Sequence, residues 1–187
     1  IKEFSLSRVS KSGAKFDVQK AYWFNQQYLQ KKPLTDVYST VKPLIDDLGY
    51  EVCQEYVEGV IDMMREKVQF AKDTILDGKY FFEDPTEYDE KVVSKKWQAN
   101  TNELLLKISD SYTGLPETAS PEQYEESFKS VCEENGVKPG SLMQPLRVAI
   151  SGQGVGAPIW EMIAHLGRDY AIERLNVATQ KISFSNP

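Results

Sequence analysis

The sequence predicts an all-α fold, and three observations support this prediction. Apolar residues recur every three to four positions over long stretches, which is the spacing of one helix face. No stretch alternates apolar and polar residues in the way that a half-buried strand does. Helix-capping and helix-breaking residues separate the periodic stretches, and the clearest break, at Gly114 and Pro116, divides the chain into two parts near residue 116.

The first part opens with a predicted connector and two helices. Residues 1–17 are rich in Ser and Gly and are predicted to be a connector. Asp17 can cap a helix over residues 18–30, because its carboxylate can accept from the first free backbone N–H groups. The stretch 33–49 predicts a second helix, in which Pro43 marks a kink or a restart.

A long third helix is predicted over residues 50–75. Its core-facing stripe has helical spacing and consists of Val52, Tyr56, Val60, Met63 and Met64. An aromatic loop over residues 76–90 follows, in which Phe81 and Phe82 are expected to fill a gap between helices. Two shorter helices should complete the first part, at about residues 88–97 and 100–112.

The second part begins with a strong helix-start signal. Ser120 and Gln123 have the spacing of a capping box, and Pro121 stands at the first helical position. Four helical stretches are predicted from there to the end of the chain: 122–136, 140–150, 157–167 and 168–182.

Charge is distributed unevenly along the chain, whose formal net charge is −6. Residues 1–32 carry seven Lys or Arg against two acids, and residues 138–187 carry five against three. Residues 33–137 hold ten basic and 23 acidic side chains. A polyanion could therefore approach through the two ends of the chain, although acidic helices that are simply solvated explain the same counts.

The cysteines and the hydropathy pattern indicate a soluble cytoplasmic protein. Cys53 and Cys132 are too few for a disulfide framework, and both are predicted to be free thiols in the core. No apolar run approaches the length of a membrane span, so no membrane partner is expected.

Catalytic patterns are sparse. The stretch AISGQGVGAPIW, residues 149–160, has three glycines at alternate positions, but a helix-spaced segment precedes it where a dinucleotide site needs a strand. His165 is the only histidine, and no second histidine or carboxylate cluster has the spacing of a metal site. By itself the polypeptide does not have the features of an enzyme.

Three stretches in order carry a recognisable family pattern. The first, residues 4–29, has Phe16, Asp17, Lys20, Trp23 and Asn25 at the characteristic positions, and the second spans residues 63–84. The third is the most specific, and its matching residues are Gln144, Pro145, Leu146, Arg147, Ala149, Gly152, Pro158, Leu166, Gly167, Arg174 and Leu175. Together these stretches resemble the C-terminal, anticodon-binding portion of bacterial glutamyl-tRNA synthetases.

The resemblance implies an α-helical cage of two subdomains that recognises an anticodon. Residues 1–116 would be a linker and the first anticodon-binding subdomain, and residues 117–187 the second. The parent enzyme joins glutamate to its tRNA using ATP and magnesium. This portion is expected to have no catalytic residue, cofactor or metal of its own, and to act as a monomer. Its implied partner is tRNA(Glu), with tRNA(Gln) as a second candidate.

The resemblance also implies a set of anticodon-binding residues. The glycine turn would lie beside the bound bases, where the absence of Cβ atoms lets them approach the main chain. Lys67 stands where relatives use arginine against the third anticodon base, and lysine lacks the bidentate fork of arginine. Trp160 offers an aromatic face if it points outward, and the core is its alternative place. The implied anticodon-binding residues are Arg147, Lys67, Gln144, Ala157, Pro158 and Trp160.

A helical protein-interaction module is the competing hypothesis from a different functional class. In such a module the acidic middle of the chain would contact the partner, and Arg147 would be dispensable. Steep salt dependence of tRNA binding distinguishes the two, because phosphate contacts release counterions.

Overall fold

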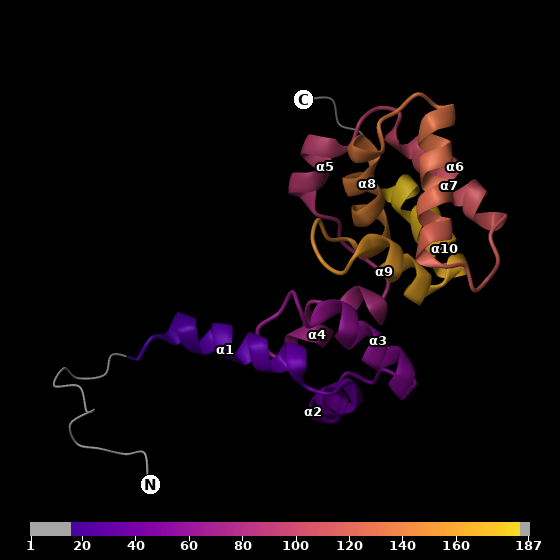
Figure 1. The fold of residues 1–187 in the computed structure, drawn as a ribbon. Helices are drawn as coiled ribbons and strands as arrows, with labels where there is room; N and C mark the ends of the chain where they lie inside the picture. The colour runs from indigo at the N-terminus through magenta and orange to yellow at the C-terminus, as the bar shows by residue number, and fades with distance from the viewer. Residues whose placement is uncertain (1–15, 184–187) are drawn as a thin grey trace, which may run out of the picture.

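A computed structural model describes residues 16–183 (Figure 1). Within this range every regular element is a helix, which confirms the predicted all-α class. The predicted connector, apart from its last two residues, lies outside the described range. The elements are α1 (Val18–Lys31), α2 (Leu34–Asp47), α3 (Gln54–Met64), α4 (Asp73–Leu76), the 3-10 turn η2 (Lys79–Phe81), α5 (Glu90–Lys96), α6 (Thr101–Thr113), α7 (Pro121–Glu134), α8 (Pro139–Ser151), α9 (Ile159–Leu166) and α10 (Arg168–Lys181).

Helices α1 to α4 form one lobe (Figure 1). Asp17 caps α1 as predicted, accepting from the Lys20 N–H at 3.1 Å. Helix α2 continues through Pro43 without restarting, and its buried face packs against α3. The residues at this contact face are the apolar ones spaced three to four apart, Val37, Val41 and Ile45 on α2 with Val57, Val60 and Ile61 on α3.

The predicted third helix is too long at both ends. Helix α3 begins at Gln54 and ends at Met64, where the Lys67 N–H donates to the Met64 carbonyl and turns the chain. Asp73, the first residue of α4, accepts from the Phe70 N–H at 3.2 Å. Val68, which follows the turn, is buried in the core.

Two predicted core positions at the start of this helix are wrong. Val52 and Cys53 precede α3 and are exposed, because the chain enters the helix from an extended segment on the surface. Cys132 is buried in α7 as predicted. Phe81 is buried and Phe82 is half-buried against the core, in agreement with the expected filling of a gap between helices.

Helices α5 to α10 form the second lobe (Figure 1). Helix α6 packs against α7 and α10, and α5 packs against α8. The predicted capping box starts α7, with the Ser120 N–H donating to the Gln123 side chain at 2.9 Å. Gly152, in the left-handed conformation at φ 75°, ends α8.

The division predicted near residue 116 stays a prediction about independent folding units. In space α5 and α6, which precede residue 116, pack with the helices that follow it. The two lobes meet where α3 contacts α9. At this seam the His165 ring of α9 stacks on Tyr56 at 4.3 Å between ring centres, and its Nε2 lies 2.9 Å from the Tyr56 carbonyl oxygen.

Candidate nucleic-acid interface

A groove of about 760 Å3 lies where the turn after α3 faces α8 and the glycine turn. Three of the six predicted site residues, Lys67, Gln144 and Arg147, line it. Lys67 comes from the first lobe, and the other two come from α8 in the second. The remaining lining residues are Met64, Val68, Leu76, Asp77, Gln153, Gly154, Val155 and Gly156.

Arg147 is held in the groove wall by the main chain. It is half-buried, and its Nη1 donates to the Ala157 carbonyl at 2.7 Å. Burial lowers the pKa of this guanidinium, which nevertheless stays charged at neutral pH. Among residues 16–183 no carboxylate lies within ion-pair distance of it. Since a guanidinium carries five N–H donors, most remain available to an acceptor in the groove.

The glycine turn is shaped by protein contacts on its far side. A Cβ on Gly154 would lie 2.6 Å from Val92, and a Cβ on Gly156 would lie 2.7 Å from the Tyr80 hydroxyl oxygen. Gly156 also has a φ of 150°. Neighbouring residues of the protein thus already require the missing Cβ atoms, and the expected approach of bases to this turn stays a prediction.

Tyr80, which no sequence pattern marked as a site residue, links the first lobe to this turn. Its buried hydroxyl accepts from the Ala157 N–H at 3.0 Å and lies 3.4 Å from the Met64 sulfur, to which it donates. Burial raises the pKa of the Tyr80 phenol, so it remains protonated. One side chain thus fixes both the end of α3 and the residue whose carbonyl holds Arg147.

Arg174 is the second residue that the sequence analysis did not assign to the site. It is only 5% exposed, and it donates to the main-chain carbonyls of Tyr80, Glu83 and Ile150 at 2.7 to 3.1 Å. Its Nε also donates to Asp84 at 3.0 Å. Arg174 lies on the buried face of α10, and a cation on such a face must find several acceptors. That position was the available signal.

The other three predicted residues lie outside the groove lining. Ala157 is fully buried and contributes through its backbone, and Pro158 is exposed at the N-terminus of α9. Trp160 is half-buried and packs against Phe128, with ring centres 5.2 Å apart. Of the two places considered for Trp160, the structure favours packing against the core. A role for any of the six in RNA binding stays a prediction.

The described range, residues 16–183, has neither a metal-binding cluster nor a membrane-spanning helix. Residues 16–183 contain no group of three or more His, Cys, Asp or Glu side chains arranged to hold a metal ion. None of the helices between residues 16 and 183 combines the length and the apolar character needed to cross a membrane.

Comparison with known proteins gives a consistent family assignment. A family model described as an anticodon binding domain matches residues 34–179. A glutamate–tRNA ligase of Prosthecochloris aestuarii is 34% identical over 195 residues, a match that covers 98% of this chain and 38% of the relative. A glutamate–tRNA ligase of Chlorobium phaeobacteroides is 35% identical over 185 residues, a match that covers 92% of this chain and 36% of the relative. The chain thus spans little more than a third of the length of these relatives.

Solved structures of the same kind share the fold. A glutamate tRNA ligase from Elizabethkingia meningosepticum, in complex with its amino acid, superposes with a TM-score of 0.89 at 33% identity, covering 97% of this chain and 36% of that one. The glutamate-tRNA synthetase of Elizabethkingia anophelis gives a TM-score of 0.82 at 35% identity, covering 96% and 35%.

Proposed function

The chain belongs to the anticodon binding domain family, and we propose that it recognises the anticodon of tRNA(Glu) as part of a glutamate–tRNA ligase. The observation that carries this proposal is the groove that Lys67, Gln144 and Arg147 line from both lobes. It offers charged and amide donors beside an apolar wall that includes Met64 and Val68.

This combination suits unstacked bases. Sequence-specific RNA recognition uses bases splayed out of the helix, packed on flat or apolar surfaces and hydrogen-bonded along their edges. Arg147 would donate to a base edge or a phosphate, and Gln144 can both donate and accept. Lys67 would add a mobile charge from the opposite wall, and its adaptability keeps tRNA(Gln) as a second candidate partner.

The catalytic activity, the joining of glutamate to tRNA, would reside in the rest of such a ligase. We propose that ATP and magnesium act there, in the joining of glutamate to tRNA, and that the portion described by residues 16–183 supplies anticodon binding only. The whole enzyme is proposed to work in the cytoplasm as a monomer.

Binding of tRNA by the 187-residue chain tests the proposal. Fluorescence anisotropy would compare a tRNA transcript carrying a glutamate anticodon with one carrying an unrelated anticodon. We expect preference for the first and an affinity that falls steeply with salt. Equal, weak and salt-independent binding of both transcripts would contradict anticodon recognition and favour a protein-interaction module.

Arg147→Ala is the decisive variant. Loss of one charged contact to a base should weaken binding by about 1–3 kcal/mol and reduce the preference between the two transcripts. Lys129→Ala removes the same charge from the exposed surface of α7 and is the matched control. Equal losses in the two variants would show that Arg147 contributes net charge only.

A further inference from the structure

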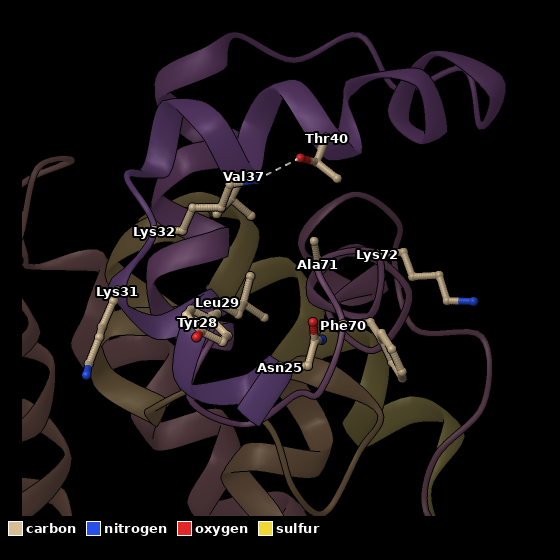
Figure 2. Close-up of a pocket in the computed structure, with 10 residues that line it drawn as sticks. All are labelled: Asn25, Tyr28, Leu29, Lys31, Lys32, Val37, Thr40, Phe70, Ala71 and Lys72. Atoms are coloured by element: carbon tan, nitrogen blue, oxygen red, sulfur yellow. Dashed lines mark hydrogen bonds between the residues drawn. The ribbon is translucent and has the colours of Figure 1, made fainter. Parts of the chain in front are cut away.

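We propose that a second groove binds the phosphate backbone of the same tRNA. It lies beside the groove that Lys67, Gln144 and Arg147 line, which is called the anticodon groove below. This inference rests on the proposed function. The second groove, called the lysine groove below, has a volume of about 740 Å3 and lies between α1, the start of α2 and the segment before α4. Figure 2 shows its lining residues, among them Lys31, Lys32 and Lys72.

Charge is the first argument. Among residues 16–183, three lysines and no carboxylate line the lysine groove, in a chain whose net charge is −6. Two acids are adjacent in sequence to lining residues, Asp36 beside Val37 and Asp73 beside Lys72, but neither lines the groove, and Asp73 accepts a hydrogen bond from the Phe70 N–H. Lys32 lies 3.4 Å from the Thr40 hydroxyl, and within residues 16–183 none of the three lysines forms an ion pair. The groove is therefore a local anion-binding surface on an acidic protein.

Aromatic exposure is the second argument. Tyr28 is 73% exposed and Phe70 is 39% exposed, and both line the lysine groove. In Figure 2 Lys31 and Lys72 extend toward opposite sides with these two rings between them. Proteins that hold single nucleic-acid strands combine lysines that follow the phosphates with aromatic faces against bases or riboses.

Continuity with the anticodon groove decides between RNA and an acidic protein as the occupant. The segment between α3 and α4 forms part of both grooves, since Lys67 and Val68 line the first and Phe70 and Lys72 line the second. Phe70 lies three residue steps after Lys67, which limits their Cα separation to roughly 11 Å. A strand that leaves the anticodon groove can thus enter the lysine groove directly.

Helix α1 is fastened to the same segment. The Gln26 side chain donates to the Glu66 carbonyl at 3.1 Å, and the Asn25 side chain donates to the Gln69 carbonyl. Lys31 at the end of α1 and Lys32 at its C-cap are consequently held at a fixed place relative to Lys67, as two parts of one binding surface require.

Replacement of all three lysines tests the inference. In the 187-residue chain, Lys31→Ala, Lys32→Ala and Lys72→Ala together should weaken binding of the glutamate-anticodon transcript by about tenfold or more. They should also lower the slope of log affinity against log salt by about 2 to 3, one phosphate contact for each lysine. The matched control removes three exposed lysines elsewhere, Lys95, Lys96 and Lys138, and should leave the slope nearly unchanged.

A second transcript separates the two proposals. The triple variant should lose affinity equally for the glutamate anticodon and for an unrelated one, whereas Arg147→Ala should alter the ratio between them. If Arg147→Ala alters the ratio while the triple variant behaves like its control, the lysine groove is refuted and the proposed function stands. If the chain binds no tRNA, both are refuted. Tyr28→Ala should weaken binding without changing the salt slope, and an unchanged affinity would overturn the role of the aromatic face.

Discussion

Two hydrogen bonds of Ala157, one to Tyr80 and one from Arg147, determine where Arg147 lies in the groove. The Ala157 N–H is buried and its acceptor is the Tyr80 hydroxyl at 3.0 Å. The carbonyl of the same residue accepts from Arg147 at 2.7 Å. A change at Tyr80, which does not line the groove, should therefore reach Arg147 through one peptide unit.

Tyr80→Phe removes only the hydroxyl that accepts from the Ala157 N–H and so tests how much this hydrogen bond contributes. Loss of the hydroxyl leaves the buried Ala157 N–H without an acceptor, which should lower the free energy of unfolding by about 1–3 kcal/mol. Urea denaturation measures the change, and Tyr28→Phe, on an exposed ring, is the control and should stay within about 0.5 kcal/mol. Unchanged stability for Tyr80→Phe would mean that the turn does not depend on this bond.

At the residue scale the sequence supports some site assignments and misses others. Gln144 and Arg147 come from a specific family resemblance, and the structure places both in one groove with Lys67. Tyr80 and Arg174 act through backbone groups distant in sequence, such as Ala157 and Ile150. The buried position of Arg174 on α10 signals that it needs acceptors, but no local pattern identifies the partners of either residue, because only tertiary packing brings them together.

Helices were predictable where capping residues fix their ends. Ser120, Pro121 and Gln123 start α7 as predicted, and Gly152 ends α8. The turn over residues 65–72 was not predictable, because Val68 continues the helical spacing of apolar residues four positions beyond Met64, yet the chain leaves the helix at Met64 and places Lys67 in the groove. Tertiary packing outweighs helix periodicity at this point.

Contact between α3 and α9 gives a prediction at the element scale. A Cβ on Gly59 would lie 2.4 Å from the His165 ring, which is fixed by stacking and by its hydrogen bond. Gly59→Ala should therefore destabilise the protein by about 1–3 kcal/mol through overpacking, even though alanine favours the helix.

Gly140→Ala is the matched control for that substitution. Gly140 lies in the first turn of α8, and a Cβ there would meet nothing within 4 Å. Here the helix preference of alanine acts alone and should add about 0.5–1 kcal/mol to the free energy of unfolding. Thermal denaturation of both variants should give shifts of opposite sign, and shifts of the same sign would contradict the proposed contact.

The seam between the lobes should make the stability of the whole molecule sensitive to pH. His165 is the only histidine, and burial lowers the pKa of its imidazole below the ordinary value of 6.5. The unfolded chain then binds the proton more readily than the folded one, so stability is present above pH 6.5 and falls as the pH decreases below it. Urea denaturation between pH 8 and pH 5 measures this slope. His165→Gln keeps a donor but does not titrate, so it should flatten the slope; an equal slope in the variant would exclude His165 as its source.

Truncation tests which parts of the chain fold as units. The division predicted near residue 116 would make residues 117–187 an independent subdomain. Within the structure, however, α6 packs against α7 and α10, and its Tyr112 ring meets Tyr124 edge to face at 5.0 Å between centres. Removal of α6 would expose the fully buried Tyr124 and Phe128 to water.

A chain of residues 117–187 should therefore lack a cooperative thermal transition. One that begins at residue 79 should keep it, because it retains α5 and α6 together with the acceptors of Arg174 at Tyr80, Glu83 and Asp84. Loss of α6 removes four large buried side chains, Leu104, Leu105, Ile108 and Tyr112. Each should lower the free energy of unfolding by about 1.5–3 kcal/mol, because its burial is lost. That sum reaches the range of a whole domain's net stability. Circular dichroism during heating distinguishes the two chains, and a cooperative melt of the shorter one would locate the folding boundary at residue 116 after all.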